Sequence, residues 1–286
     1  MTFVYDNRIC ELGEGPLWHP ERQQLFWFDI LGRRLLAQED DTLKEWPFDE
    51  CVSAAGWIDD ATLLIASESA LLRFDTLSGD RERVADLEVN NPATRSNDGR
   101  ADPWGGFWIG TMGKNAERGA GAIYRYYRGE VRCLASGITI PNAISFPPDA
   151  GFMCYADSLT GVVMRLSLDD ATGWPFGEAA PFLDLKPAGL IPDGAVFDAA
   201  GHFWVAQWGA GQVASYDSDG KFLRAVEVPG RHSSCPAFGG PQMRDLFCTS
   251  ARQGLSADDI ASEPKNGMTF CLQDVALGQR EAQVIL

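Results

Sequence analysis

The feature that most constrains the fold is a short apolar phrase that recurs six times along the chain. Each copy reads as a strand rich in aromatic and β-branched residues, and the copies are LFWFDI, TLLIAS, FWIGTM, MCYADS, FWVAQW and LFCTSA. The central residues of these phrases, from Trp27 to Phe247, are separated by 37, 44, 47, 49 and 43 residues. A repeat of forty to fifty residues, with a strand-like segment in each copy, is typical of one propeller blade. The sequence therefore predicts an all-β, six-bladed β-propeller in which residues 1–286 form one domain.

A propeller of this kind closes when the two chain ends share a blade. Residues 3–5 and residues 282–286 both read as strands, so we expect them to meet in the last blade. Sequence patterns typical of helices are nearly absent, and the SADDIA segment after Leu255 is expected to form one helical turn at most.

The net charge and the cysteine content limit which partners and which cellular compartment are expected. Acidic residues number 40 and basic residues 24, which gives a net charge of −16. An acidic surface repels phosphate groups, so neither nucleic acid nor a membrane is an expected partner. The first residues lack the pattern of a signal peptide, and no apolar run is long enough to span a bilayer. Seven cysteines without a CxxC pair indicate buried free thiols, and we predict a cytoplasmic protein.

The repeat also aligns one polar position across the blades. Counting back 11 to 13 residues from each phrase centre reaches a residue in the loop that is expected to enter the phrase. These ring positions are Glu14, Ser53, Asn97, Asn142, Asp193 and Pro236. Residues at one phase of successive blades surround the central channel, so we expect these side chains to meet in one small volume.

Four of the ring positions carry oxygen donors. Glu14 and Asp193 would repel each other across a narrow channel, which would raise the pKa of one of them. A divalent cation removes this penalty, and oxygen-only ligands suit hard cations. With three or four protein ligands, open positions remain for water or substrate, which is the layout of a catalytic site. Taken singly, the NDG and PDG sequences are ordinary turns, and only their shared phase favours a site.

Other catalytic chemistry has little support in the sequence. There is no GxSxG elbow and no HExxH spacing. His19 and His202 are expected to lie in solvated turns. His232 lies three residues before Cys235 and could reach the channel, but a nucleophilic pair there is disfavoured. Among the aromatic residues, Trp208 follows a channel strand and is the first to test as a ligand platform.

Five motifs in order resemble one known family, the SGL family of senescence marker protein, gluconolactonase, regucalcin and luciferin-regenerating enzyme. The motifs are LGEGPLWH with WFDI, RSNDGRADPWGGFWIGTM, IPNAISFPPD with YADS, PDGAVFDAAGHFWVAQWGAGQV, and FGGPQMRDLFCTSAR. The resemblance runs from about residue 13 to residue 252. It implies a six-bladed propeller with one divalent metal ion in the central channel.

The resemblance also implies roles for individual residues of this chain. Glu14, Asn142 and Asp193 match the metal ligands of the family. Arg95 and Asn97, in the R-x-N-D-G motif, match positions that contact substrate, with Asn97 also near the metal. Glu117 matches a carboxylate that binds sugar hydroxyls, although its loop varies in length. The resemblance assigns no role to Cys235 or His232.

The resemblance implies hydrolysis of a sugar lactone to the aldonic acid, with a small-molecule lactone as the partner. The metal would polarise the lactone carbonyl and activate water, with Asp193 as a ligand and a possible general base. The alternatives are a hydrolase of other esters or phosphotriesters, and a calcium-binding regulatory protein without turnover. The metal stays open among Ca²⁺, Zn²⁺, Mn²⁺, Mg²⁺ and Fe²⁺. A monomer or a weak homo-oligomer is expected.

Overall fold

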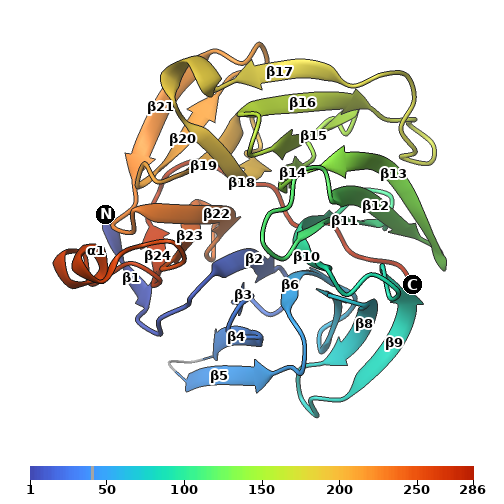
Figure 1. Ribbon diagram of the computed structural model, residues 1–286, viewed down its shortest axis with the longest axis horizontal. Helices are drawn as coiled ribbons and strands as arrows, with labels where there is room; N and C mark the ends of the chain where they lie inside the picture. Colours follow the sequence, from blue (N-terminus) through green and yellow to red (C-terminus); the bar gives the residue numbers. More distant parts are fainter. Residues whose placement is uncertain (40–41) are drawn as a thin grey trace.

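The computed structural model describes residues 1–39 and 42–286 and consists of six four-stranded antiparallel sheets around a central axis (Figure 1). Blade one contains β2 (Gly13–His19), β3 (Gln24–Asp29), β4 (Arg34–Glu39) and β5 (Thr42–Pro47). Blade two contains β6 (Val52–Trp57), β7 (Thr62–Ser67), β8 (Ala70–Asp75) and β9 (Arg81–Asp86). Blade three contains β10 (Thr94–Ala101), β11 (Phe107–Gly113), β12 (Gly121–Tyr127) and β13 (Glu130–Ile138).

The second half of the chain repeats this order. Blade four contains β14 (Pro141–Ser145), β15 (Phe152–Asp157), β16 (Val162–Ser167) and β17 (Ala180–Asp184). Blade five contains β18 (Ile191–Phe197), β19 (Phe203–Trp208), β20 (Gln212–Tyr216) and β21 (Phe222–Glu227). Blade six contains β22 (His232–Gly239), β23 (Asp245–Ala251), β24 (Thr269–Leu272) and, from the other end of the chain, β1 (Thr2–Asp6).

The six apolar phrases are the second strands of the six blades, which confirms the predicted propeller. These strands are buried on both faces, because each blade packs between two neighbours; all six residues of β3 are buried, for example. The outermost strands lie at the rim, and β21 is almost entirely exposed. A continuous run of apolar residues is therefore typical of the buried second strand of each blade.

The prediction for closure of the propeller is half right. β1 pairs with β24 and supplies the outer strand of blade six. Residues 282–286 form no strand, because β1 already occupies the outer position there. The C-terminal segment instead runs to blades two and three, where the Val284 N–H donates to the Trp57 carbonyl and the Ile285 N–H donates to the Gly105 carbonyl, at 2.8 and 2.9 Å (Figure 1).

Helical structure is minor. A 3₁₀ turn, η1 (Lys186–Ala188), precedes blade five, and α1 (Ala257–Ser262) lies between β23 and β24. α1 is somewhat longer than the single turn expected, because Ser256 and Asp259 form a capping box that stabilises its start. No helix within residues 1–39 and 42–286 has the length and apolar character needed to cross a membrane.

Candidate functional site

The ring residues lie on the innermost strands of the blades, so the prediction that they lie in loops is wrong. In blades one, three, four and five the pairing with the second strand slips at the ring position, as between Glu14 and Leu17 or between Asn142 and Ser145. The backbone just after two of these residues is left-handed, with φ of +52° at Gly15 and +58° at Ala143. Residues that read as turns thus form β-bulges, which bend the strand and redirect its side chains toward the channel.

A cavity of about 580 Å³ opens where the innermost strands begin. This volume is within the range of small-molecule sites, roughly 300–1,000 Å³. Five of the predicted site residues line it, and all five are nearly fully buried: Glu14, Arg95, Asn97, Asn142 and Asp193. Ring position Ser53 does not line the cavity; its hydroxyl donates to the Ser96 hydroxyl at 2.8 Å.

Hydrogen bonds determine how the two asparagine amides point. The Arg95 guanidinium donates to Asn97 Oδ1 at 2.7 Å, and Asn97 Nδ2 donates to Asn142 Oδ1 at 3.0 Å. Because arginine can only donate, the Asn97 oxygen must face Arg95 and its amide nitrogen must face Asn142. Asn142 Oδ1 therefore accepts from Asn97 and keeps a second lone pair for a further partner in the cavity.

Ser158 fixes the other side of the Asn142 amide. Its hydroxyl donates to the Pro192 carbonyl at 2.6 Å and accepts from Asn142 Nδ2 at 2.8 Å. Ser158 is buried directly after β15 and also lines the cavity. Sequence reasoning missed this residue because it has no counterpart in the phase of the ring. The only signal was a polar residue just beyond the apolar strand MCYAD.

The buried carboxylates carry strongly shifted pKa values. Burial, followed by the charge of Asp98, raises the pKa of Glu14 to about 8. Burial and the charge of Glu14 raise the pKa of Asp193 well above its ordinary value. Burial also raises the pKa of Asp98 to about 6 and lowers the pKa of Arg95. These shifts have the direction expected for two acids that share a small buried volume.

The donor set fits a hard divalent cation. It consists of the carboxylates of Glu14 and Asp193 and the side-chain oxygen of Asn142, with no nitrogen or sulfur donor among them. Oxygen donors of this kind suit Ca²⁺, Mg²⁺ or Mn²⁺, and two negative charges match the charge of the ion. The Asn97 oxygen already accepts from Arg95, so Asn97 fits better as a group that orients Asn142 than as a direct ligand.

Glu117 lies apart from the other predicted site residues. Its side chain is exposed and accepts from the backbone N–H and the side-chain amide of Asn115, at 3.1 and 2.9 Å. The cavity is lined by its neighbours Lys114, Asn115 and Ala116, and not by Glu117. The structure brings Arg95 and Asn97 together with the candidate ligands, whereas the role of Glu117 stays a prediction.

The three histidines have separate surroundings. The prediction of a solvated turn is wrong for His19, which ends β2, is buried and has Nε2 3.0 Å from the Asp59 carbonyl of blade two. The His232 ring stacks on Trp208 with 4.2 Å between ring centroids, and Trp208 lines the cavity. Cys235 is buried against Gly194, and burial raises the pKa of its thiol well above the ordinary value, which disfavours a thiolate nucleophile.

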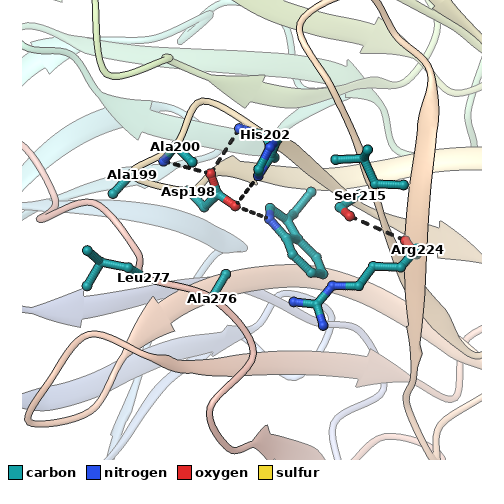
Figure 2. A pocket seen from close by; sticks show the side chains of 10 residues that line it. Asp198, Ala199, Ala200, His202, Ser215, Arg224, Ala276 and Leu277 are labelled. Atoms are coloured by element: carbon teal, nitrogen blue, oxygen red, sulfur yellow. Dashed lines mark hydrogen bonds and ion pairs between the residues drawn. The ribbon is translucent and has the colours of Figure 1, made fainter.

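Another cavity, of about 440 Å³, lies between blade five and the segment that contains Ala276 and Leu277, and it contains a carboxylate–imidazole pair (Figure 2). Asp198 Oδ2 accepts from Trp204 Nε1 and contacts His202 Nδ1, both at 2.9 Å. Blade three has the same arrangement, in which Asp102 accepts from Trp108 Nε1 at 2.8 Å. The Asp198–His202 pair therefore belongs to a repeated arrangement, which we call a carboxylate bracket: an aspartate directly after the innermost strand accepts a hydrogen bond from the tryptophan indole of the second strand. We assign the pair a structural role.

Comparisons with known proteins agree with the six-bladed fold. The structure superposes on that of a calcium-binding protein, regucalcin, from Agrobacterium tumefaciens with a TM-score of 0.97 and 41% identity, covering 99% of this chain and 97% of that one. An L-arabinolactonase from Azospirillum brasilense is 35% identical, covering 99% of this chain and 94% of that protein. A 6-deoxy-6-sulfogluconolactonase from Pseudomonas putida is 33% identical, covering 91% and 90% of the two chains.

The model of one family covers most of the chain. Residues 12–252 match the SMP-30/gluconolactonase/LRE-like region, and this span includes every candidate site residue described above. The match begins just before the first ring residue and ends just after β23 of blade six. The chain therefore belongs to the SMP-30/gluconolactonase/LRE-like family.

Proposed function

We propose that the protein is a metal-dependent lactonase that hydrolyses a sugar lactone to its aldonic acid. The observation that carries the proposal is the buried oxygen set of Glu14, Asn142 and Asp193 beside the donors of Arg95 and Asn97. Relatives named L-arabinolactonase and 6-deoxy-6-sulfogluconolactonase support the substrate class.

In this proposal each residue has a chemical task. A divalent cation held by Glu14, Asn142 and Asp193 would polarise the lactone carbonyl and increase the acidity of water. Asp193 accepts the proton of the attacking water as the new carbon–oxygen bond forms. The bond between the carbonyl carbon and the ring oxygen then breaks, and the ring oxygen becomes a hydroxyl by taking the proton that Asp193 accepted. General-base assistance of this kind contributes roughly 10²–10⁴-fold.

In this proposal Arg95 holds the sugar hydroxyls. It lines the cavity, is almost fully buried, and its guanidinium donates to the Ser96 carbonyl and to Asn97 Oδ1. A guanidinium fixed in this way would orient a substrate oxygen that accepts from one of its other N–H groups. Glu117 is the remaining candidate contact, and it would have to reach the substrate by a movement of its loop.

The decisive experiment compares Asp193→Ala with the control Asp217→Ala, which changes a half-buried aspartate in the turn after β20 that does not line the cavity. Protein treated with a chelator is refilled with Ca²⁺, Zn²⁺, Mn²⁺, Mg²⁺ or Fe²⁺ and assayed on a panel of aldonolactones. We expect Asp193→Ala to lose at least about 10²-fold in kcat/KM and to lose its bound metal, whereas Asp217→Ala keeps both. A folded Asp193→Ala variant with unchanged turnover would refute the proposal.

Calcium binding without turnover is the second candidate, because the regucalcin structure is described as that of a calcium-binding protein. The same donor set suits Ca²⁺. Tight Ca²⁺ binding combined with no turnover of any lactone, ester or phosphotriester in the panel would favour this candidate. The cytoplasmic location and the monomeric or weakly oligomeric state stay predictions.

A further inference from the structure

Blades four and five contribute large apolar side chains to the cavity in addition to the polar residues Asn142, Ser158 and Asp193. We define the apolar wall as these four residues: Ile140, Leu159, Ile191 and Trp208. Leu159 and Ile191 are 50% and 42% exposed, which is high for large aliphatic side chains beside a buried site. A ligand seated in the cavity would cover them.

The apolar wall is held by strand ends. Ile191 begins β18 and is paired directly with Trp208 at the end of β19. The Ile140 carbonyl accepts from the Ser158 N–H at 3.0 Å, next to Leu159. Trp208 is backed by the His232 ring, whose Nδ1 lies 3.0 Å from the Gln253 carbonyl. The wall is therefore pre-organised, and no rearrangement is needed for it to contact a ligand.

Blade three and the loop after β11 contribute charged and amide side chains. Arg95, Lys114 and Asn115 line the cavity there beside the apolar Met112, and Lys114 Nζ forms an ion pair with Glu68 at 2.6 Å. Hydroxyl groups of a ligand can exchange hydrogen bonds with these polar side chains. The side chains of Ile140, Leu159 and Ile191 can offer none.

We propose that the site selects deoxy-sugar lactones, whose carbon chain ends in a methyl group, over lactones that end in a hydroxymethyl group. The inference rests on the proposed function, which directs the carbonyl to Glu14 and Asp193 and the ring hydroxyls to Arg95. The end of the carbon chain then lies against the apolar wall. A methyl group is buried there favourably, whereas a hydroxyl loses its water without gaining a partner.

Matched substrate pairs test the preference. L-rhamnonolactone and L-mannonolactone differ only in a terminal methyl in place of hydroxymethyl, and so do L-fuconolactone and L-galactonolactone. For at least one pair we expect kcat/KM to favour the methyl compound by about tenfold or more, mainly through KM. Equal values, or a preference for hydroxymethyl in both pairs, would overturn the proposal.

Two wall variants and one control locate the effect. Leu159→Asn and Ile191→Thr place a hydrogen-bonding group on the wall, and each is expected to reduce the methyl preference at least threefold. Leu77→Asn changes a leucine that is 75% exposed in the turn after β8, does not line the cavity, and should leave the preference unchanged. An unchanged preference in both wall variants would also overturn the proposal.

Binding of the corresponding lactams, in which an N–H replaces the ring oxygen, separates this proposal from the lactonase proposal. Turnover without a methyl preference would refute the apolar wall alone. Preferential binding of methyl lactams without any lactone turnover would support the wall and refute the lactonase. If the protein shows neither lactone turnover nor preferential binding of methyl lactams, both proposals are refuted.

Discussion

At the scale of single residues, the candidate metal site depends on groups that are not ligands themselves. The oxygen of Asn142 can face Glu14 and Asp193 only if its amide nitrogen has acceptors elsewhere. Ser158 supplies one, and its own hydroxyl proton is committed to the Pro192 carbonyl of blade five. A backbone carbonyl of one blade thus orients a side chain of the neighbouring blade through a single hydroxyl.

Replacing Ser158 by alanine should weaken the metal site without unfolding the protein. The change removes two hydrogen bonds, each worth about 1 kcal/mol, and leaves only the bond from Asn97 Nδ2 to orient the Asn142 amide. Loss of such an orienting partner typically lowers metal affinity or activity 10–100-fold, and we expect Ser158→Ala to fall in that range. Competition with a chelating dye measures the affinity. Ser145→Ala removes another buried serine of blade four and serves as the control; equal affinity in the two variants would contradict the prediction.

The raised pKa of Glu14 makes the metal-free protein sensitive to pH. The folded state holds the Glu14 proton up to about pH 8, whereas the ordinary value is 4.5. Because the folded state binds the proton more tightly, stability of the metal-free protein should fall as the pH rises through this window. Metal must displace the same proton, so metal affinity should fall as the pH drops below about 8.

Thermal unfolding of chelator-treated protein between about pH 5 and about pH 8 checks the sign. In Glu14→Gln, which carries no titrating group at this position, the dependence on pH should be flatter. A wild-type protein whose unfolding temperature rises with pH across the window would show that the Glu14 proton is not retained.

At the scale of elements, a carboxylate bracket positions the second strand in two blades. Asp102 and Asp198 each follow the innermost strand and accept from the indole of the tryptophan in the next strand. The partners differ. Asp102 also pairs with Arg125 at 2.7 Å, with both side chains fully buried, whereas the His202 side chain beside Asp198 is 39% exposed.

The two brackets should therefore differ in their contribution to stability. Asp102→Ala leaves the Arg125 charge buried without a counter-ion, which costs about 3–5 kcal/mol. Asp198→Ala leaves the Trp204 indole and two backbone N–H groups without their acceptor, beside an imidazole that water can reach, so about 1–3 kcal/mol is expected. Urea unfolding with a shared m-value measures the difference. A larger loss for Asp198→Ala would mean that the buried ion pair does not dominate.

At the scale of the whole molecule, the two chain ends close the propeller in different ways. β1 completes blade six by backbone pairing. The C-terminal segment instead ties together blades that lie far from it in sequence. Glu281 forms an ion pair with Arg100, the Trp57 indole donates to the Glu281 carbonyl at 3.0 Å, and Val284 is buried in the core.

Two glutamate–arginine ion pairs, each with one member in the C-terminal segment, allow a matched test of this closure. Glu281 pairs with Arg100 in a nearly buried setting, whereas Glu21 pairs with Arg280 on the surface. We expect Glu281→Ala to cost about 3–5 kcal/mol and Glu21→Ala about 0–1 kcal/mol. Chemical unfolding followed by two spectroscopic probes measures both costs. Non-coincident transitions would also contradict the prediction that residues 1–286 form one domain.

Most of the architecture could be read from the chain because each blade repeats the same local pattern. The second strand of every blade is buried between neighbours, so its text is apolar in all six copies and the period is visible. The ring position follows from the same period. Four of its six members, Glu14, Asn97, Asn142 and Asp193, line the cavity, whereas Ser53 and Pro236 do not. These features depend on local sequence and on one symmetry.

The tertiary structure alone decided whatever depends on which segments become neighbours. His19 is buried because blade two packs on the end of β2, residues 282–286 form no strand because β1 already fills blade six, and Ser158 matters because it meets Asn142 and Pro192. The cavity likewise excludes Glu117 and includes the apolar wall. The sequence by itself determined the repeat and the chemistry placed at one phase of it, since both are written in local order. Contacts between blades required the folded molecule, because they join residues that no period relates.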